Sequence, residues 1–301
     1  MSDFIISIDG TPAGAQLAMF LALFSAVAHA LFGALQKGRY DPWLTRGAID
    51  IFYGAAALPV ALIFFPLPDR QLLLILVGVL IIHTVYKLLM AMAYSRAAYT
   101  VVYPVVRGTS PFVTVIFAYM VFGEVFEPMQ WAGVALLSGA ILSLALVNLA
   151  REKIGRAALK NALIIAFIGG LTTAGYTTYD AWGIRLTADP LQFLVWFFVV
   201  DGLFVFPWIA LVRWRRMADR PAPGPLLRKG AFGALVAVGS FGAVMLATRL
   251  DSVGEAAVLR ETSTVFAALI GWFVLKEPVG PLRAGLMALI ALGAVLVEFG
   301  G

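Results

Sequence analysis

The sequence contains no cysteine and only two histidines, and charged residues make up 13% of its 301 positions. Without cysteine the chain has no disulfide framework, no thiolate nucleophile and no cysteine-based metal site. A soluble domain carries about 25% charged residues, so this chain has too little polar surface to cover a water-soluble globule. The shortage of charge excludes a cytosolic enzyme and a disordered protein.

The basic residues do not indicate nucleic acid as a partner. Lys and Arg number 22 against 17 Asp and Glu, a net charge of only +5, and their positions are more informative than their excess. The segment Met1–Gly10 holds two aspartates and no Lys or Arg, which is the wrong charge for the start of a signal peptide. We expect no nucleic-acid partner and no cleaved signal.

Long apolar runs dominate the chain, since 61% of the residues are hydrophobic and the mean hydropathy is +0.93. About 20 apolar residues cross the roughly 30 Å bilayer core as a helix, and continuous rather than alternating runs favour helices over a β-barrel. The sequence therefore predicts an all-α polytopic membrane protein with the lipid bilayer around it. Ten spans are predicted, at 15–35, 44–65, 71–93, 99–122, 129–149, 160–180, 190–212, 230–248, 255–275 and 281–298.

Lys and Arg are distributed unevenly between the two sides of these spans. The joints after the first, third, fifth, seventh and ninth spans, with their helix ends, hold sixteen, whereas the termini and the other joints hold three. Because positive residues stay on the cytoplasmic side, this distribution favours both termini outside.

The chain also repeats itself. Arg107-Gly108-Thr109-Ser110 and Arg260-Glu261-Thr262-Ser263 lie 153 residues apart, and Glu124 and Glu277 share that offset. A second set of matches, 148 residues apart, pairs Asp41 with Asp189, Gly54 with Gly202 and Pro59 with Pro207. The repeat divides the chain into residues 1–152 and 153–301, with five helices each. Because five is odd, the second copy enters the membrane from the opposite side, and such inverted repeats frame a substrate site near the midplane.

The repeated segments resemble the signatures of one transporter group. Tyr103-Pro104-Val105-Val106-Arg107-Gly108-Thr109-Ser110-Pro111, followed by Glu124, resembles the fourth-helix signature of the drug/metabolite transporter superfamily, EamA branch. Leu259-Arg260-Glu261-Thr262-Ser263, running to Leu275-Lys276-Glu277-Pro278, resembles its ninth-helix counterpart. The resemblance covers nearly the whole chain and implies a ten-helix carrier with a central cavity lined mainly by helices 1, 3, 4, 6, 8 and 9.

The resemblance carries further implications. It implies export of amino acids or other small metabolites across a bacterial inner membrane, while eukaryotic relatives exchange nucleotide sugars or sugar phosphates. It also implies cytoplasmic termini, against the charge count. Small four-helix multidrug members use a glutamate in their first helix, but the first helix here has no carboxylate between Asp9 and Asp41, so that mechanism is not expected.

Ionisable residues within the spans are the candidate functional residues, because each costs at least about 2.5–3.5 kcal/mol near the bilayer centre and so needs a partner or a role. Lys87 shares a face of the third span with His83 and Tyr86, a combination of cation, proton carrier and aromatic donor that suits a cavity wall. Two alternatives stay open. Lys87 can extend its stem to the interface, and His83 can be a satisfied interior histidine.

Arg107 lies deep in the fourth span, one turn after Tyr103. Its guanidinium could clamp a substrate carboxylate with two hydrogen bonds, although a fixed ion pair with Glu261 or Asp50 is the interpretation that we favour. Arg260 and Glu261 are adjacent and point about 100° apart on a helix, so only one of them faces the cavity. Glu261 is the better candidate for proton coupling, because a desolvated carboxylate takes up a proton more readily.

Other polar residues complete the candidate set. Asp201 has eleven apolar or neutral residues on each side in the seventh span, and either a structural pair with a neighbouring Arg or Tyr or a functional role explains it. In the sixth span, Tyr176 and Asp180 belong to a polar stripe. His29 in the first span and Ser240 in the eighth also point to a cavity, although such groups often serve only as contacts between helices.

We expect a secondary transporter that moves a small polar metabolite, a zwitterion such as an amino acid, by alternating access. The candidate residues carry both signs, whereas an anion carrier should show an excess of basic groups. An organic-anion or sugar-phosphate exchanger and a non-transporting accessory protein are the alternatives. The chain has no ATP-binding glycine loop, so we expect coupling to a proton or a counter-substrate. No cofactor, metal or enzymatic activity is expected, and the chain should be a monomer or a weak dimer.

Overall fold

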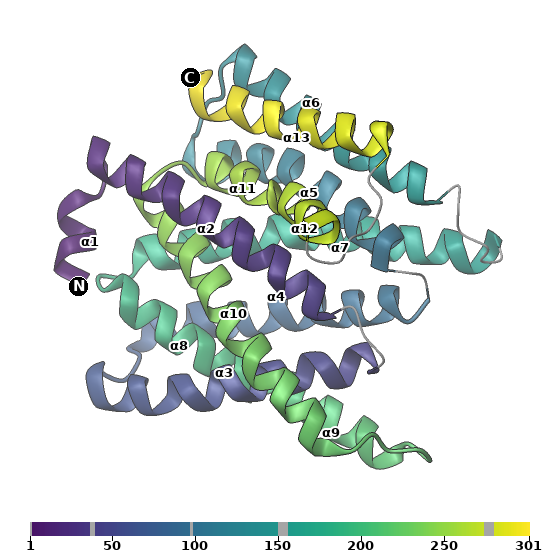
Figure 1. Cartoon of the computed structure of the whole chain (residues 1–301). Helices are drawn as coiled ribbons and strands as arrows, with labels where there is room; N and C mark the ends of the chain where they lie inside the picture. Colours follow the sequence, from purple (N-terminus) through teal and green to yellow (C-terminus); the bar gives the residue numbers. More distant parts are fainter. Residues whose placement is uncertain (1, 37–39, 97–98, 150–155, 274–279) are drawn as a thin grey trace.

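The computed structural model describes residues 2–36, 40–96, 99–149, 156–273 and 280–301, and the regular structure within these ranges is α-helical (Figure 1). This confirms the predicted all-α membrane fold. The helices are α1 (Ser2–Ile8), α2 (Pro12–Gln36), α3 (Pro42–Phe64), α4 (Arg70–Tyr94), α5 (Tyr99–Phe122), α6 (Pro128–Leu149), α7 (Arg156–Leu186), α8 (Pro190–Leu203), α9 (Phe206–Arg216), α10 (Pro223–Leu250), α11 (Val253–Glu261), α12 (Ser263–Phe273) and α13 (Pro281–Phe299).

Within these ranges, nine segments are long and apolar enough to cross a membrane, and they match nine of the ten predicted spans. The exception is the predicted span 255–275. It is divided into α11 and α12 at Thr262, and its last two residues lie outside the described part of the chain. The short helix α1 was not predicted. It contacts α2 and α8, and its Ser2 hydroxyl donates a hydrogen bond to Asp189 at 2.6 Å.

Proline and aspartate mark where many of the helices begin. Proline is the first residue of α2, α3, α6, α8, α10 and α13, a position at which its missing N–H loses no helical hydrogen bond. Asp41, Asp69 and Asp189 cap α3, α4 and α8 by accepting hydrogen bonds from main-chain N–H groups of the first turn. The predicted span 190–212 is bent between α8 and α9, and Pro207 lies in the first turn of α9, where it cannot continue the hydrogen bonds of the preceding helix.

The helices pair as two inverted five-helix units require. α2 and α7 are the first spans of the two halves, and α4 and α10 are the third spans. α2 packs on α10, and α7 packs on α4, so the first span of each half contacts the third span of the other. α6 lies beside α13 and α3 beside α8 (Figure 1), so the fifth and second spans each contact their own counterpart. The predicted boundary between residues 152 and 153 lies outside the described residues.

Paired glycines bring α3 and α8 close together. A Cβ atom added to Gly202 would lie 2.7 Å from the Cα of Gly54 and 2.7 Å from the carbonyl oxygen of Asp50. Only residues without a side chain allow two backbones to approach so closely. This contact holds Asp50 on α3 opposite Asp201 on α8.

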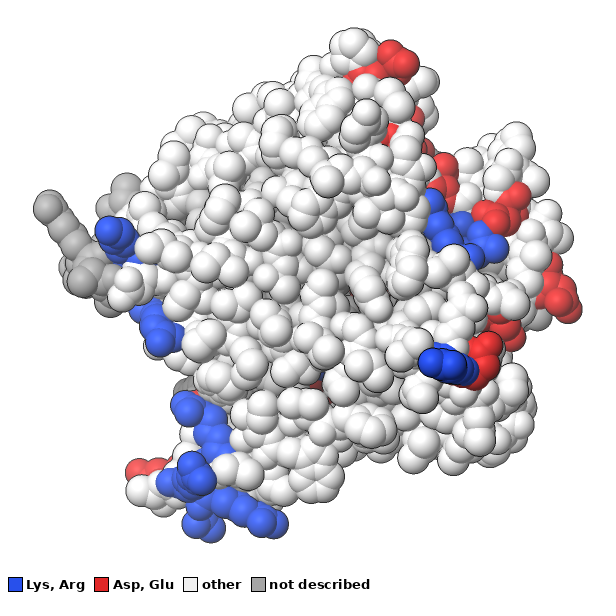
Figure 2. All heavy atoms as spheres, turned by 180° about the vertical axis from the view of Figure 1, so that it is seen from behind, with Lys and Arg blue, Asp and Glu red and all other residues white. Residues whose placement is uncertain are grey.

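Both chain ends lie on the same side of the bundle, at the left of Figure 1. From behind, Figure 2 shows most of the Asp and Glu at one end of the molecule with a few Lys and Arg among them, and the other Lys and Arg at the opposite end. The predicted position of one of the sixteen cations on the Lys- and Arg-rich side is wrong. Arg46 lies within α3, its side chain is only 16% exposed, and it is ion-paired with Asp50.

Candidate functional site

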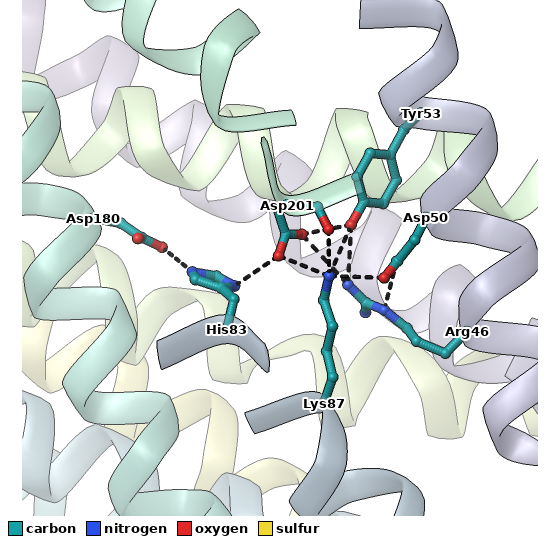
Figure 3. Close-up of polar contacts among 7 residues, drawn as sticks. All are labelled: Arg46, Asp50, Tyr53, His83, Lys87, Asp180 and Asp201. Atoms are coloured by element: carbon teal, nitrogen blue, oxygen red, sulfur yellow. Dashed lines mark hydrogen bonds and ion pairs between the residues drawn. The ribbon is translucent and has the colours of Figure 1, made fainter. Parts of the chain in front are cut away.

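A buried cluster of charged side chains joins α3, α4, α7 and α8 (Figure 3). Lys87 lies at its centre, with Nζ 2.7 Å from Asp50 Oδ2 and 2.7 Å from Asp201 Oδ1. The same Nζ donates a hydrogen bond to the main-chain carbonyl of Asp201 at 2.9 Å. We call this cluster the lysine network; its members are Arg46, Asp50, Tyr53, His83, Lys87, Asp180 and Asp201.

Two α3 residues complete the contacts of the central carboxylates. Arg46 Nε lies 2.7 Å from Asp50 Oδ1, an ion pair between residues one helical turn apart. The Tyr53 hydroxyl donates a hydrogen bond to Asp201 Oδ2 at 2.5 Å. Asp201 therefore has a Lys and a Tyr as its direct partners, and the structural pairing considered from the sequence is present.

His83 extends the network towards α7. Its Nε2 lies 2.9 Å from Asp180 Oδ2, and its Nδ1 lies 4.0 Å from Asp201 Oδ1. The imidazole packs against the rings of Tyr176 and Phe197, with centroid distances of 4.6 and 5.0 Å. The second carboxylate oxygen of Asp180, Oδ1, is buried and has no hydrogen-bond partner. His83 thus lies between two carboxylates, one of which has unused hydrogen-bonding capacity.

A second buried cluster, the arginine network, consists of His29, Arg107, Arg260 and Glu261. Arg107 Nη1 donates to Glu261 Oε1 at 2.8 Å, and Arg107 also contacts His29. The favoured ion pair of Arg107 with Glu261 is therefore present, whereas the alternative partner, Asp50, belongs to the lysine network instead. Ser240 lies beside this network, with its hydroxyl 3.4 Å from His29 Nδ1.

Arg260 differs from the other buried cations. Its side chain is 3% exposed, yet no carboxylate among the described residues lies within ion-pair distance of it. The guanidinium packs over the Phe241 ring at 4.8 Å and lies 3.5 Å from His29 Nδ1, while its Nε has no hydrogen-bond partner. Because Glu261 compensates only one of the two arginines, the arginine network keeps one positive charge.

Two small cavities lie next to these networks. The larger, of about 40 Å³, is lined by residues that include Arg46 and Lys87 of the lysine network and His29 and Arg107 of the arginine network. The smaller, of about 10 Å³, is lined in part by Asp180 and Arg260. A water molecule needs roughly 10–15 Å³, so each of these two cavities holds a few waters at most.

Aromatic rings in contact with one another connect the linings of the two cavities. Phe241 lines both of them. Its ring centroid lies 6.5 Å from that of Tyr176, which packs in turn on Tyr86 at 4.9 Å. The lining of the larger cavity includes Pro42, which begins α3 next to a Lys- and Arg-rich joint. The lining of the smaller cavity includes Thr248, in the last turn of α10, near the opposite side of the protein.

The predicted site residues divide between the cavities and the layer behind them. Lys87, Arg107, His29, Tyr86 and Tyr103 line the larger cavity, and Tyr176, Asp180 and Arg260 line the smaller one. Ser240, His83, Asp201 and Glu261 contact these lining residues without being part of either lining.

Sequence reasoning missed three members of the lysine network. Asp50 was considered only as a partner of Arg107, Arg46 was counted as an interfacial cation, and Tyr53 was not considered. A signal was present, because Tyr53 and Asp201 are 148 residues apart, the same offset as that of the repeated glycines beside them. No group of three or more His, Asp or Glu side chains in the described ranges could hold a metal ion.

Comparison with known sequences finds a similarity to one transporter family. Residues 160–299 match the model of the EamA-like transporter family. The match covers the second half of the chain and supports an integral membrane protein of the drug/metabolite transporter type. It agrees with the family predicted from the repeated motifs.

A solved structure has the same fold over nearly the whole chain. A protein crystal structure with a TM-score of 0.75 and 17% sequence identity covers 94% of this chain and 96% of its own. It is one of 28 matching structures. No curated protein sequence matches the chain.

Proposed function

We propose that this transporter is a secondary carrier for a small zwitterion, such as an amino acid, and that it works by alternating access. One observation carries the proposal. Arg260, which has no carboxylate partner among the described residues, lines the same small cavity as Asp180, whose Oδ1 has no hydrogen-bond partner. A buried guanidinium can bind a carboxylate with two hydrogen bonds, and a buried carboxylate can accept from an ammonium group. The two groups of a zwitterion supply both partners.

The charge balance of the two networks supports this substrate class. The lysine network contains the cations Arg46 and Lys87 and three carboxylates, so with a neutral His83 it carries one net negative charge. The arginine network carries one net positive charge. Uncompensated charges are costly in a low-dielectric interior, and a bound zwitterion offers one opposite charge to each network.

The two cavities provide the routes for alternating access. Both are lined by Phe241, and a carrier that opens one cavity while keeping the other closed exposes the binding groups to each side in turn. The volumes of these two cavities are too small for an amino acid, so binding requires the aromatic side chains between them to move. The positive-inside rule favours a cytoplasmic position for the larger cavity, which lies towards the Lys- and Arg-rich side. In a bacterium we expect the carrier in the inner membrane.

An organic anion is the second candidate substrate. The larger cavity is lined by Arg46, Lys87 and Arg107, and no acidic side chain belongs to its described lining. Each of these cations is, however, paired with a carboxylate behind the wall. The uncompensated cation is Arg260, and the charge balance favours the zwitterion.

Counter-exchange in proteoliposomes tests the proposal. Vesicles containing the purified protein and an unlabelled probe are diluted into the same labelled probe. L-Alanine, L-threonine, L-leucine and L-phenylalanine serve as zwitterions, succinate as a dianion and putrescine as a dication. We expect exchange of at least one amino acid and none of succinate or putrescine.

Arg260→Gln should weaken this exchange. Loss of a hydrogen bond to a charged group costs about 1.5–3 kcal/mol, so we expect at least a tenfold rise in KM. The matched control is Arg213→Gln, because Arg213 is absent from both cavity linings, pairs with Asp41 at the surface and is 44% exposed. Exchange of succinate without any amino acid would establish the anion carrier, and unchanged kinetics in Arg260→Gln would contradict the zwitterion site.

A further inference from the structure

His83 lies in a position suited to a coupling proton. It is buried on α4, between Asp180 of α7 and Asp201 of α8 (Figure 3). Its two ring nitrogens face one carboxylate each, and a neutral imidazole carries a proton on only one of them. A protonated imidazole donates from both nitrogens, which matches the two acidic neighbours.

The groups around His83 determine how much charge it meets. Lys87 lies on α4 itself, Tyr176 and Asp180 lie on α7, and Asp201 lies on α8. From α3 the carboxylate of Asp50, the hydroxyl of Tyr53 and the guanidinium of Arg46 reach the same network. Arg260 of α11 lines the cavity that Asp180 lines. Three carboxylates thus share two permanent cations within the lysine network, and one proton on His83 would make the network neutral.

We propose that His83 is the proton site of this carrier and that a proton on His83 and the ammonium group of the substrate on Asp180 exclude each other. This inference rests on the proposed function. Asp180 Oδ2 is the partner of His83, and Asp180 Oδ1 is the oxygen without a partner. Each cation supplies the single positive charge that the lysine network lacks, so binding of one weakens binding of the other.

Glu261 is less suited to this role, although the sequence favoured it. It is paired with Arg107, and the neighbouring Arg260 has no carboxylate of its own among the described residues. Protonation of Glu261 would leave two arginines without any compensating charge in the arginine network. The proton site therefore belongs to the network that has an excess of carboxylates.

Mutual exclusion makes the carrier a proton antiporter. One proton crosses the membrane in one direction for each amino acid that crosses in the other, and no bond other than that to the proton is formed or broken. Because the zwitterion has no net charge, each cycle moves one positive charge. With the membrane potential clamped at zero, a gradient of one pH unit should drive tenfold accumulation of the amino acid.

Two assays on the same proteoliposomes test the inference. The first is counter-exchange of labelled amino acid at equal pH on both sides. The second is accumulation driven by an acidic lumen, one pH unit below the outside, with potassium and valinomycin holding the potential at zero. We expect His83→Gln to retain counter-exchange and to lose gradient-driven accumulation. Asp69→Asn is the control, because Asp69 caps α4 outside the network and asparagine is also a good cap.

The unaltered protein provides an independent measurement. Pyranine trapped in the lumen should report about one proton leaving for each amino acid that enters, and this tests the predicted antiport even if His83→Gln does not fold. The absence of proton movement during uptake, or full accumulation by His83→Gln, would overturn this inference. Either result together with intact counter-exchange would leave the proposed function unaffected. Absence of counter-exchange in the unaltered protein would overturn the proposed function itself.

Discussion

Replacing Lys87 with methionine tests whether charge balance holds the helices together. Lys87 Nζ lies 2.7 Å from one oxygen each of Asp50 and Asp201, and its side chain is 1% exposed. Methionine fills similar space without the charge. Asp50 would keep Arg46 as a partner, whereas Asp201 would retain the Tyr53 hydroxyl and the guanidinium of Arg46 at 3.8 Å.

The expected loss of stability is large. Removing one partner of a buried ion pair costs about 3–5 kcal/mol, because the other charge stays buried without compensation. Each kcal/mol shifts Tm by roughly 2–4 °C in proteins of about 150–250 residues. We therefore expect Lys87→Met to lower Tm by about 10 °C, measured from the fluorescence of the 7 tryptophans during heating in detergent.

A double variant separates charge from packing. Lys87→Met combined with Asp201→Asn removes one charge of each sign, and Tyr53 can still donate to the asparagine oxygen. The double variant should be more stable than Lys87→Met alone. If Lys87→Met melts within about 2 °C of the unaltered protein, or if the two substitutions simply add, the lysine network does not depend on charge balance.

Two further substitutions test the contacts that position the networks. Gly202→Val adds a Cβ 2.7 Å from the Cα of Gly54, so it should cost about 1–3 kcal/mol by overpacking and lower Tm. Gly139→Ala is the control and should leave Tm unchanged, because a Cβ at Gly139 meets nothing within 4 Å. Equal melting temperatures of the two variants would refute this contact. Glu124 accepts hydrogen bonds from the Val253 and Gly254 N–H groups and thereby caps α11. Glu124→Ala should cost about 0.5–2 kcal/mol, with Glu124→Gln losing less, and an unchanged Tm in both would show that the cap does not stabilise the fold.

The sequence predicted the fold well because apolar length and proline position are local signals. Nine spans and their order follow from composition, and the resemblance to one transporter family follows from the repeated motifs around Arg107 and Arg260. The division of α11 from α12 at Thr262 was not predictable in this way, because hydropathy records how apolar a segment is and not whether its hydrogen bonds continue.

The site was predicted less completely. Lys87, His83 and Asp201 were recognised because charges deep in a span are costly, but their partners depend on how α3 packs against α4 and α8. Arg46 lies near the start of a span, and the sequence does not distinguish a cation at the interface from one that turns inward. The repeat offset shared by Tyr53 and Asp201 was the available signal for contact across the pseudo-symmetric pair.

Cysteine accessibility tests the central claim most directly, since the natural chain has no cysteine. Ala91→Cys places a thiol in the lining of the larger cavity, and Thr248→Cys places one in the lining of the smaller. Alternating access predicts that a membrane-impermeant maleimide reaches the two thiols from opposite faces of the membrane. It also predicts that a transported amino acid raises the labelling rate of one and lowers that of the other. Labelling of both from a single face, or parallel changes with substrate, would contradict a carrier that opens to each side in turn.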